Sequence, residues 1–76
     1  MDRVAEVVIG KLKEITGRDD ITLESSFLTD VVLTSVNAMK LSFDIENELG
    51  CKEIPQEIFY SVETVGDLAD AVRELL

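Results

Sequence analysis

The chain has 76 residues, a single cysteine (Cys51) and no histidine. A fold this small buries a limited share of its surface and usually needs disulfides, a metal or very good helix packing. One cysteine allows no internal disulfide, and without histidine the usual zinc ligand sets are missing. The same absences remove Ser-His and Cys-His nucleophile pairs. We therefore expect one domain over residues 1–76, held by apolar packing alone, with no metal site.

Charge restricts the partners. The chain has 16 acidic residues against 7 basic ones, for a net charge of -9 at pH 7. Such a surface repels nucleic acid and anionic membranes and attracts basic patches on other proteins. Because 46% of the residues are apolar, we expect a folded domain rather than a disordered acidic tail.

The start of the chain bears on location. Met1 is followed at once by Asp2 and an amphipathic pattern, with no basic leader, long apolar run or anchor motif. We expect a monomeric protein in the cytoplasm. Met1 directly ahead of the first helix predicts a free-standing protein rather than a piece of a larger synthase.

Apolar residues at helical spacing predict two long helices in the first two thirds of the chain. The first runs from Asp2 to about Thr16 and the second from Ser35 to Leu49, and Gly17 and Gly50 are placed to end them. Arg18 to Thr34 follows neither helical nor strand periodicity, which indicates a long packed loop of the kind that often has a function. The 35–49 helix is apolar over more than half of its circumference, which predicts a central helix touching several neighbours.

Two further helices are predicted after Gly50. Ile54-Pro55 forms a connection, and Gln56 to Ser61 indicates a short helix. Thr64 with Asp67 three positions later is typical of a capping box that begins the last helix. The fold class is therefore all-α, with three longer helices and a short one.

Thr34-Ser35 lies where the loop meets the 35–49 helix. A hydroxyl side chain at this place commonly caps the free amides of a helix start. The same place also suits a phosphate diester, because unpaired N–H groups and the positive dipole end stabilise negative charge. Local sequence alone predicts the same location for both roles.

Four segments in order carry a wider resemblance. They are residues 30–36 (DVVLTSV), 41–50 (LSFDIENELG), 53–55 (EIP) and 62–68 (VETVGDL). Together they resemble the acyl carrier protein family over nearly the whole chain. The resemblance implies an antiparallel four-helix bundle with the long loop packed across it, and it aligns Ser35 with the modified serine.

The resemblance also implies a chemistry. Ser35 would be the substrate of a phosphopantetheinyl transferase that uses coenzyme A, and the cofactor would be a covalent 4'-phosphopantetheine. The thiol of that arm, not Cys51, would carry acyl groups to acyl-transferring and condensing enzymes with basic docking patches, in fatty acid, polyketide or related biosynthesis. The chain would have no catalytic residue, and without histidine it would hold a thioester without activating water.

The chain departs from the family pattern around Ser35. Thr34 stands in place of the usual acid, Val36 in place of leucine, and Asn37, Lys40, Asn47 and Gln56 occupy positions that are often acidic in the family. We therefore predict a dedicated carrier with its own partners. The predicted partner contacts are Asp30, Thr34, Val36, Asn37 and Lys40.

Met39 and Phe43 lie one turn apart, and such pairs are usually core. In the family, core side chains can part to admit an acyl chain. On that basis the predicted lining of an acyl pocket is Val36, Met39, Phe43, Ile58 and Phe59.

Two alternatives stay open. An aminoacyl or peptidyl carrier would have the same arm, although the acidic balance favours acyl cargo. An unmodified acidic helical adaptor would keep the fold without the arm. An enzyme is the least favoured class, because the acid pairs Asp19-Asp20 and Glu46-Glu48 read as solvated faces and no D-x-D-x-D-G calcium loop is present.

Overall fold

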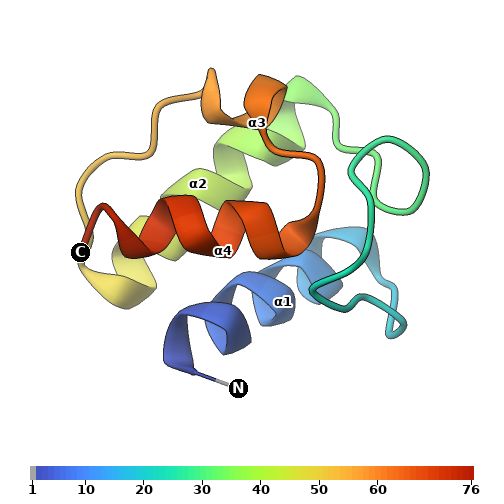
Figure 1. Ribbon diagram of the computed structural model, residues 1–76, viewed down its shortest axis with the longest axis horizontal. Helices are drawn as coiled ribbons and strands as arrows, with labels where there is room; N and C mark the ends of the chain where they lie inside the picture. Colours follow the sequence, from blue (N-terminus) through green and yellow to red (C-terminus); the bar gives the residue numbers. More distant parts are fainter. Residues whose placement is uncertain (1) are drawn as a thin grey trace.

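The computed structural model describes residues 2–76, and within them the chain forms four helices and no strand. The helices are α1 (Arg3–Thr16), α2 (Ser35–Leu49), α3 (Ile58–Ser61) and α4 (Val65–Arg73). In Figure 1, α1 runs from left to right, and α2 and α4 run back in the opposite direction. The predicted all-α fold, with three longer helices, one short helix and a long loop after the first, is confirmed.

The helix ends follow the sequence signals. The Asp2 carboxylate caps α1 by accepting the Ala5 N–H at 2.9 Å. Gly17 and Gly50 take the left-handed conformation, with φ of 72° and 66°, that ends α1 and α2. Thr64 and Asp67 form the predicted capping box at the start of α4.

The short helix differs from its predicted range. α3 begins at Ile58 rather than Gln56. The N–H groups of Ile58, Phe59 and Tyr60 each bond to the carbonyl three residues earlier, at 3.1 Å. These tight turns hold Gln56 and Glu57 outside the α-helical pattern.

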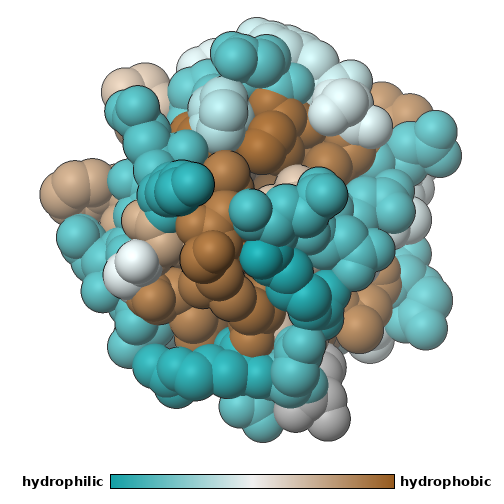
Figure 2. All heavy atoms as spheres, turned by 60° about the vertical axis from the view of Figure 1, so that its left-hand side comes forward, coloured by the Kyte–Doolittle hydropathy of each residue, from teal (hydrophilic) through white to brown (hydrophobic). Residues whose placement is uncertain are grey.

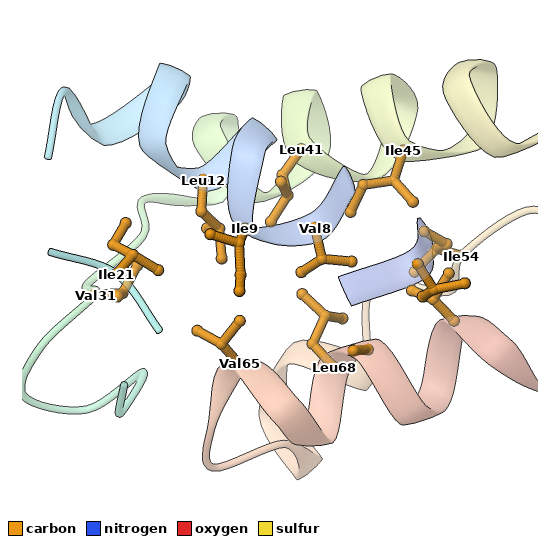
Figure 3. Packing of buried hydrophobic residues seen from close by; sticks show 13 residues of the cluster. Val8, Ile9, Leu12, Ile21, Val31, Leu41, Ile45, Ile54, Val65 and Leu68 are labelled. Carbon is orange, nitrogen blue, oxygen red and sulfur yellow. The ribbon is translucent and has the colours of Figure 1, made fainter. Parts of the chain in front are cut away.

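One apolar core joins the three longer helices (Figure 3). Side chains from α1, α2 and α4 point toward one another, with Ile21 and Val31 of the loop and Ile54 closing the ends. The buried cluster comprises Val4, Val8, Ile9, Leu12, Ile21, Val31, Leu41, Ile45, Ile54, Val65, Leu68, Ala69 and Val72. Burial of these side chains is the main favourable contribution to folding.

The loop between α1 and α2 is tied to the start of α4 by backbone hydrogen bonds. The Gly66 N–H donates to the Leu23 carbonyl at 2.8 Å, and the Val65 N–H donates to the Ser25 carbonyl at 3.0 Å. In return, the Phe27 N–H donates to the Glu63 carbonyl at 2.9 Å. The loop is packed, as expected, and its course depends on a segment about forty residues away.

The prediction of a central α2 that touches several neighbours does not hold on its outer side. Val36, Met39 and Phe43 are 74%, 61% and 63% exposed. α1 packs against the inner side of α2, whereas α3 has only four residues and buries none of them, so it does not cover the outer side. Exposed apolar atoms also reach the surface among hydrophilic ones on the face in Figure 2. None of the helices between residues 2 and 76 is both long and apolar enough to cross a membrane.

Candidate functional site

At the start of α2 the capping residue is Thr34. Its Oγ1 accepts the Asn37 N–H at 3.1 Å, and its backbone is extended as a cap requires. Ser35 is the first residue of the helix and is exposed. The two adjacent hydroxyls therefore have different positions, and that of Ser35 takes no part in the cap.

The surroundings of Ser35 suit a negative group. The Thr34 cap leaves the Ser35 and Val36 N–H groups without an acceptor among residues 2–76. The first turn of α2 also has no acidic residue. A phosphate ester on Ser35 would meet free amides and the positive end of the helix dipole without a neighbouring carboxylate on that turn.

A hollow of about 300 Å³ lies beside Ser35. Two of its aromatic walls, Phe27 and Phe59, meet edge to face with their ring centres 6.5 Å apart. The full lining is Phe27, Leu33, Thr34, Ser35, Ala38, Met39, Gln56, Phe59 and Tyr60. Of the five predicted pocket residues, Met39 and Phe59 are part of this lining.

The other three predicted pocket residues lie elsewhere. Phe43 lines a second, more open hollow of about 510 Å³, which also includes Met39 and Gln56. Val36 lines neither hollow, and Ile58 packs against the core from its edge. The sequence reasoning missed Phe27, Leu33 and Tyr60, because residues from a non-periodic loop and a four-residue helix give no periodic signal.

A polar pair lies between the two hollows. Ser42 is 3% exposed, and its hydroxyl donates to the Ala38 carbonyl at 3.0 Å. The same oxygen accepts a hydrogen bond from Nε2 of Gln56 at 3.0 Å. Ala38 and Gln56 line the hollow beside Ser35, whereas Ser42 and Gln56 line the second one.

The family model for the phosphopantetheine attachment site matches residues 6–72. The chain belongs to the acyl carrier protein family. An acyl carrier protein of Clostridium perfringens is 34% identical over 73 residues, covering 96% of this chain and 92% of that protein. The meromycolate extension acyl carrier protein of Mycobacterium leprae is 31% identical over 74 residues, covering 95% of this chain and 60% of that protein.

An acyl carrier protein is a non-catalytic protein with an attached phosphopantetheine. Within residues 2–76 no three His, Cys, Asp or Glu side chains are grouped to hold a metal ion. Burial raises the pKa of the Cys51 thiol, which disfavours the thiolate needed for a nucleophile.

Several predicted partner contacts already have internal roles in this carrier. The Asp30 carboxylate accepts a hydrogen bond from the Ser26 N–H at 2.8 Å. The backbone carbonyl of Asp30 accepts a hydrogen bond from the Arg18 guanidinium. Lys40 pairs with Asp44 at 3.2 Å. Thr34 and the backbone N–H of Asn37 form the cap, which leaves the side chains of Val36 and Asn37 as the members of this set with no such bond among residues 2–76.

The acids of α2 are also engaged within the carrier. Asp44 pairs with Lys40, and Glu46 accepts the Ile54 N–H at 2.8 Å. Glu48 lies 3.4 Å from Arg3 and 3.6 Å from Lys11. The outer side of α2 therefore exposes Val36, Met39 and Phe43 beside charged side chains that are already paired within the protein.

Proposed function

We propose that Ser35 carries the 4'-phosphopantetheine, and that the chain holds acyl intermediates as thioesters on this arm for one dedicated biosynthetic pathway. The supporting observation is the division between two hydroxyls. Thr34 caps α2, and Ser35 stands next to it, exposed, on the first turn. Modification of Ser35 would leave the cap intact.

The attachment step is a transfer from coenzyme A. A bond forms between Ser35 Oγ and the phosphorus that carries the pantetheine, and the bond from that phosphorus to the adenosine bisphosphate breaks. The hydroxyl proton leaves to a base on the transferase, since this chain has no histidine. When bound, the arm supplies a thiol for thioester chemistry. The carrier's own residues position the ester at a helix start with free amides.

The partners of this function are a phosphopantetheinyl transferase and acyl-transferring or condensing enzymes. Net charge -9 favours approach to basic surfaces. Close to Ser35 the contact would be apolar, through exposed side chains that include Val36 and Met39. One relative, 31% identical to this chain, is named for meromycolate extension. Carriers named for a single pathway therefore occur among relatives as similar as this one. We place the function in the cytoplasm, in fatty acid, polyketide or related biosynthesis.

Intact mass tests the attachment. The apo protein is incubated with coenzyme A and a promiscuous phosphopantetheinyl transferase, beside Ser35→Ala and Thr34→Ala variants. We expect the wild type and Thr34→Ala to gain one phosphopantetheine and Ser35→Ala to gain none.

Circular dichroism of each variant before the reaction excludes unfolding as the cause of a negative result. A folded wild type that gains no mass with several transferases would contradict the proposal and favour the unmodified adaptor. A gain in Ser35→Ala would place the arm on another residue.

A further inference from the structure

The space beside Ser35 is small. Its volume of about 300 Å³ lies at the lower end of the roughly 300–1,000 Å³ typical of ligand pockets. The core side chains Leu41 and Ile45 belong to α2, the helix that also supplies Ser35, Ala38 and Met39 to this lining, and they are fully buried in close packing. A long alkyl chain would have to displace such side chains, whereas a short group fits the existing hollow.

One polar side chain in the lining of this space, the exposed Gln56, is bonded to a buried hydroxyl. Gln56 holds the buried Ser42 hydroxyl at 3.0 Å, and Ser42 in turn holds the Ala38 carbonyl. A saturated chain that passed between the two hollows would separate Gln56 from Ser42 and offer no hydrogen bond in exchange. Gln56 is exposed and Ser42 is buried, so the cost would fall on the Ser42 oxygen, which would lose its donor inside the protein.

The Gln56 side chain can form further hydrogen bonds besides the one to Ser42. Its amide nitrogen has a second hydrogen and its carbonyl oxygen accepts hydrogen bonds, and the residue lines both hollows. Met39 and Phe59 supply apolar surface for a short carbon skeleton in the first hollow. A short chain with an oxygen substituent would use both kinds of surface.

On the basis of the proposed function, we propose that the cargo of this carrier is a short acyl group bearing a hydroxyl or keto oxygen, and that Gln56, supported by Ser42, is the residue that selects it. The competing cargo is a cationic aminoacyl group. Glu53 and Glu57 beside the second hollow would attract its ammonium, and that outcome is an arm of the test.

The test loads the protein with matched groups. A promiscuous transferase attaches 3-hydroxyhexanoyl-, hexanoyl- or β-alanyl-phosphopantetheine from the corresponding coenzyme A thioesters, and intact mass verifies each product. Proton–nitrogen NMR then follows the Gln56 side-chain amide and the Ser42 backbone amide, and thioester hydrolysis is timed in the same samples. We expect 3-hydroxyhexanoyl to shift both signals, and its thioester to outlast hexanoyl by about two- to ten-fold, as one net hydrogen bond allows.

Two variants isolate the selecting amide. Gln56→Leu should remove the difference between the two hexanoyl groups, and Ser42→Ala should reduce it. Asn47→Leu makes the same chemical change at an exposed position of α2 outside both hollows, and should preserve the difference.

Equal shifts and lifetimes for the two groups in the wild type would overturn this inference, as would strongest protection of the β-alanyl thioester. Neither result would contradict the proposed function. Absence of any mass gain would instead overturn both together.

Discussion

At the residue scale, two neighbouring hydroxyls have different surroundings. Thr34 satisfies the Asn37 N–H at 3.1 Å, and Ser35 is exposed beside it. Sequence alone placed a hydroxyl cap and a phosphate-bearing serine at the same location, because both depend on the free amides of a helix start. The family resemblance pointed to Ser35 for the modification, and the geometry assigns the cap to Thr34.

This separation predicts unequal effects on stability. Thr34→Ala should lower the free energy of unfolding by about 1 kcal/mol, because the N-cap bond is lost, whereas Ser35→Ala should change it little. Urea denaturation of the apo proteins measures both, with Thr34→Ser as the matched control that keeps a capping oxygen. Equal losses for Thr34→Ala and Ser35→Ala would contradict this division.

Asp2 also has two tasks, at the other end of the bundle. It caps α1 through the Ala5 N–H, and it lies 2.7 Å from Arg73 at the end of α4. The hydrogen bond from Arg73, and then that from Ala5, lower the pKa of Asp2 from 3.8 to about 2. The ion pair therefore joins the two ends of the chain.

A pH dependence follows from this pKa. Because the folded pKa lies below the unfolded one, the contribution of Asp2 is present above about pH 4 and is lost as the pH falls toward 2. Asp2→Asn keeps a capping oxygen but cannot ionise, so its melting temperature should fall less than that of the wild type across this window. Asp19→Asn, in the exposed part of the loop, serves as the control. A wild-type-like acid profile in Asp2→Asn would contradict the assignment.

At the element scale, the helices that could be predicted from the sequence are those with local sequence signals. α1, α2 and α4 could be predicted because periodic apolar residues end at Gly17 and Gly50 or begin at Thr64. The first residue of α3 was missed because its turns use bonds to the third residue back. The exposed side of α2 was missed because periodicity reports which residues are apolar and not whether a neighbouring element covers them.

The hollow beside Ser35 was predicted only in part for a similar reason. Met39 lies on a regular helix and could be placed from the sequence. Phe27 reaches the hollow because its backbone pairs with Glu63 at 2.9 Å, and pairing over such a distance leaves no trace in a local pattern.

The contact between the loop and α4 predicts opposite effects for two glycines. A side chain at Gly10 meets no atom within 4 Å, so Gly10→Ala should stabilise α1 by up to about 1 kcal/mol. At Gly66 the new Cβ would lie 3.2 Å from the Leu23 carbonyl, which the Gly66 N–H already holds at 2.8 Å. Gly66→Ala should therefore lower stability despite its better helix propensity. Urea denaturation of the pair is the measurement, and an equal gain in both would contradict the tight contact.

At the scale of the whole molecule, charge and apolar surface are distributed unevenly. The net charge is -9, yet the three acids of α2 are bonded within the protein. Several apolar side chains are exposed instead, of which Met39 and Tyr60 line the hollow beside Ser35; the others include Leu28, Val32, Val36 and Phe43. A partner would be attracted from a distance by charge and held at close range by apolar contact.

This distribution predicts that the protein is a poor substrate carrier for the enzymes of general fatty acid synthesis. A ketosynthase of an ordinary fatty acid synthase, whose docking patch is basic, should use the acylated protein more slowly than its own carrier. Steady-state condensation with equal concentrations of the two carriers is the measurement. Rates equal to those of the housekeeping carrier would contradict a dedicated partner set.

The backbone bonds between the loop and α4 have a consequence during synthesis of the chain. Residues 23–27, which precede Ser35, find their hydrogen-bond partners at residues 63–66. A nascent chain that ends before residue 63 contains Ser35 but lacks the segment that holds the loop leading to it. The surface around Ser35 is therefore assembled only once residues 63–66 have left the ribosome, so attachment of the proposed arm would report on folding of this domain.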